Sequence, residues 1–189
     1  MYQNQKMPTT FPQFIPPTSG PSSSPAGQDM TVYLDSAPYP EVSGGQYEPE
    51  ALALLKESYA GALSELTAIT AYVFQTSRMG ENEAYANAAL QIAIVEMMHL
   101  DMLGDAIETL GGVPSFDDGK TPWTAKNTPY PADLKSAIEG NIKAETGIIA
   151  NYEKFARETT NPTVRALFER IAKDHRLHLK FFEGLQATV

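Results

Sequence analysis

The sequence predicts an all-α protein, a four-helix bundle in which one long connection crosses the bundle, preceded by an extended proline-rich tail. Three observations predict this class. Apolar residues repeat at helical spacing through four segments between residues 50 and 185. Two of the three connections are short, whereas the third is about 20 residues long. Finally, eight of the 14 prolines fall before residue 47.

The first part of the chain, residues 1–46, is predicted to be an extended tail, followed by a helical domain over residues 47–189. Serine, glutamine and threonine separate its prolines, and the dipeptide Pro16-Pro17 is incompatible with a helix or a central strand. The alternative is a disordered leader. With so few apolar residues, the tail is expected to add little to the stability or metal content of the domain. Its aromatic residues are candidates for docking on the domain or on a neighbour: Tyr2, Phe11, Phe14 and Tyr33.

Four helices are predicted, at about 50–78, 82–110, 132–158 and 162–185. Pro49 suits the first turn of the first helix, Gly111-Gly112 ends the second, and Asn161-Pro162 caps the fourth. The short turns make each pair of helices antiparallel. The link over residues 112–131, with four prolines, is long enough to cross the bundle.

Composition excludes several classes of function. A net charge of −9 argues against nucleic acid or an anionic membrane as partner. The absence of cysteine excludes zinc ribbons, iron–sulfur centres and disulfides. No apolar stretch approaches the roughly 18 residues of a membrane span, and the N-terminus lacks the pattern of a secretory signal.

All three histidines occur at helical spacing within apolar segments. Glu96 precedes His99 by three residues, so the carboxylate and the imidazole project from one face of the second helix. The halves of the domain also repeat: Glu65 precedes His99 by 34 residues, and Glu145 precedes His178 by 33. This repeat predicts a site for two metal ions inside the bundle.

Each candidate ligand also has a plainer interpretation. Glu96 and His99 would form a buried ion pair without metal. Glu65 and Glu145 would lie at the edge of the bundle, and His178 would be a core histidine whose nitrogens are hydrogen-bonded within the protein. Residue 175 is open between a ligand, an outer hydrogen-bond partner and a structural histidine. Asp174 is a weaker substitute ligand. The metal-ligand candidates are Glu65, Glu96, His99, Glu145, His178 and His175.

Two tyrosines repeat with the glutamates, Tyr72 seven residues after Glu65 and Tyr152 seven after Glu145. They are either outer hydrogen-bond partners of the site or core residues. The methionines of the second helix are expected to be packing residues: Met97, Met98 and Met102.

The type of ligand restricts the metal. Carboxylates and imidazoles without sulfur suit iron or manganese, and zinc less specifically. The negative charges of three glutamates fall one short of neutralising two divalent ions, and a bridging hydroxide would supply the difference. The spacing does not choose between iron and manganese.

The domain resembles the ferritin-like superfamily and, within it, the manganese-catalase family, especially its short, spore-coat-associated members. The resemblance covers about residues 48–186. It is carried by residues 64–68 (SELTA), 96–104 (EMMHLDMLG) and 141–145 (NIKAE), together with Tyr152 and His178. It implies five ligands for two manganese ions: Glu65, Glu96, His99, Glu145 and His178.

The resemblance also implies an activity, the disproportionation of hydrogen peroxide. His175 departs from the pattern, because related proteins usually carry glutamate at that position, and it is assigned as a sixth ligand or a catalytic proton relay. The alternatives are di-iron ferroxidase or peroxidase chemistry, or a structural spore-coat or cargo protein with a vestigial site. The resemblance further predicts a homo-oligomer, coat or shell proteins as partners of the tail, and a cytoplasmic or spore-coat location.

Overall fold

The computed structural model describes residues 32–43 and 47–188. Within them the architecture is a helical bundle, and the only extended pairing is an isolated bridge between Asp117 and Pro122. The predicted all-α four-helix bundle is therefore confirmed. Its helices are α1 (Pro49–Ala60), α2 (Glu65–Arg78), α3 (Glu83–Thr109), α4 (Leu134–Glu158) and α5 (Pro162–Gln186).

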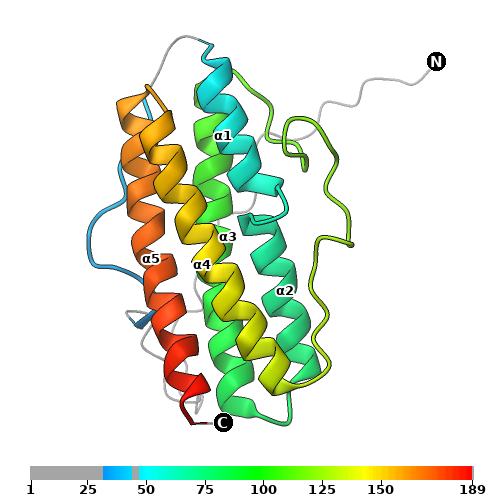
Figure 1. Ribbon diagram of the computed structural model, residues 1–189. Helices are drawn as coiled ribbons and strands as arrows, with labels where there is room; N and C mark the ends of the chain where they lie inside the picture. Colours follow the sequence, from blue (N-terminus) through cyan, green and yellow to red (C-terminus); the bar gives the residue numbers. More distant parts are fainter. Residues whose placement is uncertain (1–31, 44–46, 189) are drawn as a thin grey trace, which may run out of the picture.

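The first predicted helix is wrong in one respect, because it is divided into α1 and α2, which follow one another along the bundle (Figure 1). Ser64 causes the division: its hydroxyl donates to the Gly61 carbonyl over 2.8 Å and accepts the Thr67 N–H over 3.3 Å. It thus caps α2 while the chain leaves helical geometry at Gly61. Consequently Glu65 occupies the first turn of α2, where the helix dipole favours a negative charge.

The crossover over residues 110–133 runs down the outside of α1 and α2 and returns the chain to the opposite end of the bundle (Figure 1). It is tied to α2 by two hydrogen bonds. The Trp123 indole N–H donates to the Thr67 hydroxyl over 2.9 Å, and the hydroxyls of Thr70 and Thr128 lie 2.8 Å apart. The predicted long link is therefore confirmed.

The core runs the length of the bundle between the antiparallel pairs α2–α3 and α4–α5. Its largest fully buried side chains include Tyr72, Phe155, Phe168 and Phe182. Two of the methionines expected to be packing residues are instead exposed, Met97 by 44% and Met98 by 40%. They lie on the outer face of α3, and only Met102 packs against the core.

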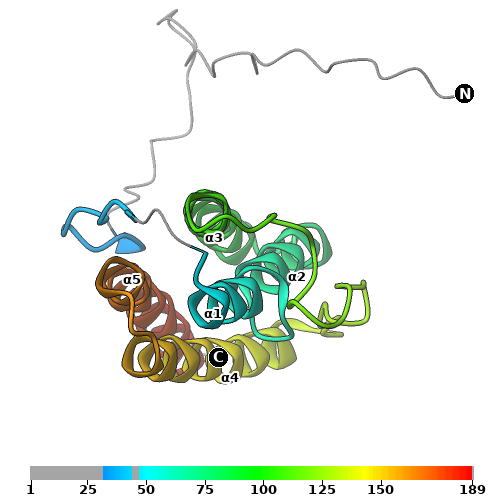
Figure 2. The same ribbon diagram turned by 90° about the horizontal axis from the view of Figure 1, so that it is seen from above.

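Residues 33–39, which we call the strap, belong to the predicted tail and lie against α5 on the side that faces α3 (Figure 2). The other docking candidates, Tyr2, Phe11 and Phe14, lie outside the described residues. The strap nevertheless packs on the bundle, whereas the small contribution expected of the tail to stability and metal content stays a prediction. Tyr33 is buried and belongs to the hydrophobic core, with its ring edge-on to Phe181.

Along the described residues, no helix is both long enough and apolar enough to cross a membrane.

Candidate metal centre

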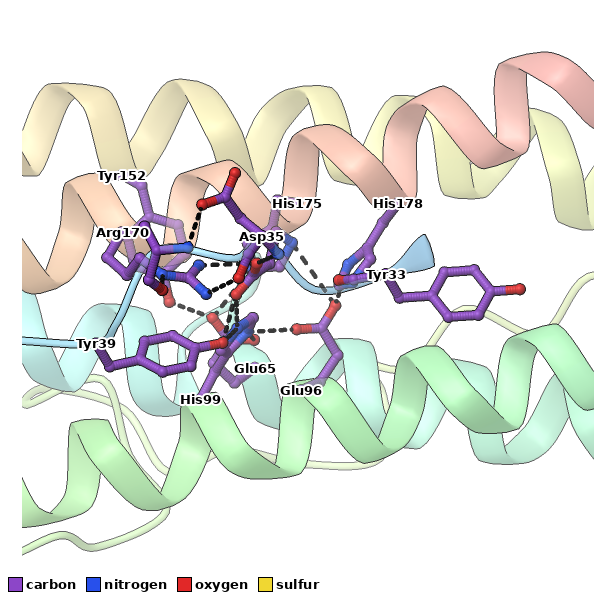
Figure 3. Close-up of polar contacts among 12 residues, drawn as sticks. Tyr33, Asp35, Tyr39, Glu65, Glu96, His99, Tyr152, Arg170, His175 and His178 are labelled. Atoms are coloured by element: carbon purple, nitrogen blue, oxygen red, sulfur yellow. Dashed lines mark hydrogen bonds and ion pairs between the residues drawn. The ribbon is translucent and has the colours of Figure 1, made fainter. Parts of the chain in front are cut away.

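The six side chains predicted as ligands lie together at the centre of the bundle, and none of them has exposed surface. Glu65 comes from α2, whereas α3 and α5 each contribute two residues (Figure 3). Glu145 comes from α4. Four separate helices therefore converge on one buried cluster. The members from α3 and α5 are Glu96, His99, His175 and His178.

The cluster divides into two overlapping groups that could each hold an ion. In each group, one ligand atom per residue lies within 4.8 Å of the others. Glu96 and His175 belong to both groups, so the two positions are adjacent. The first group is completed by Glu65 and His99, and the second by Glu145 and His178.

The carboxylate of Glu96 faces both groups at once. Its Oε2 lies 2.9 Å from His99 Nδ1, and its Oε1 lies 3.1 Å from His178 Nδ1. Glu96 Oε1, Glu65 Oε2 and His178 Nδ1 are fully buried without a hydrogen-bond partner. Because buried polar atoms nearly always have partners, these are atoms that bound cations would serve, and their carboxylate and imidazole chemistry fits divalent metal ions.

The outer ring nitrogen of His99 faces a carboxylate. Nε2 lies 3.0 Å from Asp174 Oδ2, and the Tyr39 hydroxyl, which donates to the same oxygen, lies 3.3 Å from Nε2. Burial raises the pKa of Asp174, but hydrogen bonds from His99, Tyr39 and the Asp35 N–H outweigh it and hold that pKa below its ordinary value. An ionised Asp174 can only accept hydrogen bonds, so Nε2 of His99 carries a proton. Nδ1 then points toward the candidate metal ligands.

The outer nitrogen of His178 has a different partner, the backbone carbonyl of Tyr33 at 3.1 Å from Nε2. A carbonyl only accepts, so the same tautomer results, and Nδ1 again faces Glu96. His99 and His178 therefore present equivalent atoms to the two groups. Only the character of the outer acceptor differs between them.

His175 lies between the two halves and has no outer partner of this kind. Nδ1 lies 2.7 Å from Glu145 Oε2, and Nε2 lies 3.2 Å from Glu65 Oε1. Burial lowers the pKa of His175, but the charges of Glu96, Glu65 and Glu145 outweigh it and raise that pKa well above its ordinary value. Without metal the ring is therefore an imidazolium that bridges the carboxylates of the two halves.

The neighbouring glutamates respond in the opposite sense. Burial raises the pKa of Glu65, but His175 and His99 outweigh it and hold that pKa well below its ordinary value. In the same way His175 and His178 lower the pKa of Glu145 against the effect of burial. Both carboxylates are thus ionised and ready to bind a cation.

Tyr72 and Tyr152, left open as core residues or outer partners, are both. Each is buried, and each hydroxyl donates to the glutamate of the other half: Tyr72 to Glu145 and Tyr152 to Glu65. Burial and the adjacent carboxylate raise the pKa of each tyrosine, so both remain protonated donors. The sequence repeat indicated that the tyrosines accompany the glutamates but did not show that each contacts the glutamate of the other half.

Sequence reasoning undervalued Asp174 and did not find Arg170, Asp35 or Tyr39. Arg170 and Asp174 stand one turn apart on α5 and form a buried ion pair, with Arg170 Nη1 2.8 Å from Asp174 Oδ1. Charged residues at this spacing next to the two histidines were the available signal. Asp35 and Tyr39 gave none, because their contacts with Asp174 join positions 139 and 135 residues apart in sequence.

This fold and this buried cluster define a ferritin-like helical bundle with a dinuclear metal centre. Residues 54–186 match the rubrerythrin family. The chain therefore belongs to the rubrerythrin family.

Three relatives illustrate the similarity. A bacterioferritin of Desulfovibrio desulfuricans is 29% identical over 131 residues, which cover 66% of this chain and 69% of the relative. The structure of KatB, a manganese catalase from Anabaena PCC7120, has a TM-score of 0.73 and 25% identity, covering 82% of this chain and 78% of that one. The bacterioferritin BfrA of Mycobacterium tuberculosis has a TM-score of 0.62 and 25% identity, covering 78% and 88%.

Proposed function

We propose that the protein is a dinuclear metal oxidoreductase that acts on hydrogen peroxide in the manner of a manganese catalase. The observation that carries this proposal is the Glu96 carboxylate, whose two oxygens face His99 on one side and His178 on the other. When bound, two adjacent redox-active ions supply the two-electron exchange that peroxide disproportionation needs. The similarity to KatB supports manganese as the metal.

In this proposal Glu96 would be shared by the two positions, Glu65 and His99 would hold one ion, and Glu145 and His178 would hold the other. The hydroxyls of Tyr72 and Tyr152 orient the terminal carboxylates by donating to one oxygen of each. Such outer hydrogen bonds fix the direction of a ligand and tune its basicity.

His175 is assigned to proton transfer or to a sixth ligand position, since its two ring nitrogens face Glu145 and Glu65. A neutral imidazole at this place accepts a proton at one nitrogen and releases one from the other. It therefore suits a reaction that takes protons from one peroxide and returns them to a second.

A second candidate is ferroxidase or peroxidase chemistry at a di-iron site. The similarity to the Desulfovibrio desulfuricans bacterioferritin favours it, and the ligand set accepts iron as readily as manganese. A structural coat or cargo protein is the third candidate. Homo-oligomerisation, the spore-coat location and coat-protein partners of the tail stay predictions.

Elemental analysis and oxygen release test the proposal together. The chain loaded with manganese should contain two ions per molecule and evolve oxygen from peroxide without an added reductant. Glu96→Gln should lose most of the metal and all of the activity, whereas Glu153→Gln, at an exposed residue of α4, should lose neither. Fewer than one ion per chain contradicts the dinuclear site, and peroxide consumption that requires a reductant favours the di-iron candidate.

A further inference from the structure

The strap contacts the outer ring nitrogen, Nε2, of both His99 and His178, the two histidines whose Nδ1 faces the candidate ligands. At one end, the Tyr33 carbonyl accepts from His178 Nε2 over 3.1 Å. At the other end, the Tyr39 hydroxyl lies 3.3 Å from His99 Nε2. A segment of seven residues from the proline-rich tail thus spans both halves of the site (Figure 3).

The strap also fixes the carboxylate that orients His99. The Asp35 N–H donates to Asp174 Oδ1 over 2.6 Å, and the Tyr39 hydroxyl donates to Asp174 Oδ2. The other two partners of this carboxylate are His99, which contacts Oδ2, and Arg170, which forms an ion pair with Oδ1. The docked strap therefore holds both oxygens of the Asp174 carboxylate.

Arg170 fastens the strap to α5. Its Nε donates to the Ala37 carbonyl over 2.6 Å, its Nη2 donates to the Asp35 carbonyl over 2.7 Å, and its guanidinium stacks 3.9 Å from the centre of the Tyr39 ring. Its remaining Nη1 pairs with Asp174. One side chain, only 4% exposed, thus joins the backbone of the strap to the outer partner of His99.

We propose that the strap is a positioning element of the metal centre, which sets the orientation of His99 and His178 through their outer ring nitrogens, with Arg170 as its fastening. This inference rests on the proposed dinuclear site. It also implies reciprocity: if the docked strap strengthens metal binding, bound metal strengthens docking of the strap by the same factor.

The first experiment removes one hydroxyl from the full-length chain. Tyr39→Phe keeps the aromatic ring on Arg170 but removes the donor to Asp174, and we expect affinity for one of two Mn²⁺ ions to fall by about 10-fold to 100-fold. Competition with a chelator measures both affinities. The matched control is Tyr130→Phe, which removes an exposed hydroxyl bonded to the Ala125 carbonyl in the crossover and should change neither.

A spectroscopic readout separates positioning from general stabilisation. In the zinc-loaded, diamagnetic chain, the Nε2–H resonance of His99 should shift in Tyr39→Phe while that of His178 stays unchanged. Arg170→Gln, which loosens the whole strap, should shift both. Arg176→Gln, which breaks only an exposed ion pair with Glu153, should shift neither.

Hydrogen exchange at the Asp35 amide tests the reciprocity, because that N–H is bonded only while the strap is docked on Asp174. Its exchange should slow when zinc is added to the native chain. This inference alone is overturned if the native chain binds two ions but Tyr39→Phe and Arg170→Gln leave the metal affinities and the histidine resonances unchanged. A native chain that binds no ion overturns the proposed function and this inference with it.

Discussion

The three histidines of this chain differ in what their second ring nitrogen touches. His99 has a carboxylate there, His178 has a backbone carbonyl, and His175 has a second glutamate of the site itself. The outer acceptors of His99 and His178 leave Nδ1 of each ring facing the candidate ligands, whereas both ring nitrogens of His175 face glutamates of the site. One residue type thus serves two chemical purposes within a single cluster.

The protons of these histidines predict how the metal-free chain responds to pH. The pKa values of His99 and His175 are raised in the folded chain, because nearby carboxylates outweigh the effect of burial. Their stabilising contribution is therefore fully present below the unfolded value, about 6.5, and is lost as the pH rises through the folded pKa values. We expect the urea midpoint of metal-free protein to fall as the pH is raised from about 6.5 to 9.

Manganese-loaded protein is the control for this measurement, since the bound metal replaces the protons and should make the midpoint nearly constant over the same range. Metal binding should correspondingly release protons and tighten as the pH rises. A metal-free midpoint that increases above about pH 6.5 would contradict the assignment of protonated His99 and His175.

Among the site residues, the sequence predicted those contacts that depend on spacing within one helix. Glu96 and His99 are three residues apart on one helix, so their shared direction follows from helical geometry alone. The partners of Tyr72 and Tyr152 lie on the opposite helical pair, and those of Asp174 lie on the strap. Such contacts follow from how the elements dock, which the spacing of residues within one element does not determine.

Among the elements, the division between α1 and α2 has the clearest functional consequence, because it places Glu65 in a first helical turn. The apolar repeat continues through residues 61–64 and predicted one helix. Two local features oppose that repeat, the glycine at position 61 and the capping serine three residues later. The tertiary structure stabilises the break further, since Thr67 also donates to the Gly61 carbonyl and accepts from Trp123 of the crossover.

Removing the cap should destabilise the bundle. Ser64→Ala eliminates a buried hydroxyl that serves the Thr67 N–H and the Gly61 carbonyl, and we expect a loss of about 1 kcal/mol in the free energy of unfolding. Urea denaturation followed by circular dichroism measures this loss. Ser77→Ala, near the exposed C-terminal end of α2, should change the free energy by less than about 0.5 kcal/mol. Equal effects of the two variants would contradict the capping role.

For the whole molecule, the metal centre is a concentration of buried charge at the middle of the bundle. Glu65, Glu96 and Glu145 lie there without any exposed surface, so we expect the folded chain to bind cations that the unfolded chain does not. An ion present at 100 times its dissociation constant stabilises the fold by about 2.7 kcal/mol. In a protein of this size each kcal/mol raises the melting temperature by roughly 2–4 °C.

Removing manganese with a chelator should therefore lower the melting temperature by at least about 5 °C, as measured by scanning calorimetry. Glu96→Gln is the informative comparison, because its melting temperature should be nearly the same with and without manganese. Identical melting temperatures for loaded and stripped native protein would show that the centre is not linked to folding.

The crossed hydroxyl contacts, Tyr72 to Glu145 and Tyr152 to Glu65, join the two halves of the chain in a symmetric pattern. Two identical helical hairpins facing each other about a twofold axis would exchange tyrosines in this way, so the bundle is equivalent to a dimer joined by its crossover. Either hairpin alone lacks the hydroxyl that its own carboxylate needs. A complete set of carboxylates with their donors therefore requires both hairpins, and the strap gives His99 and His178 different outer partners.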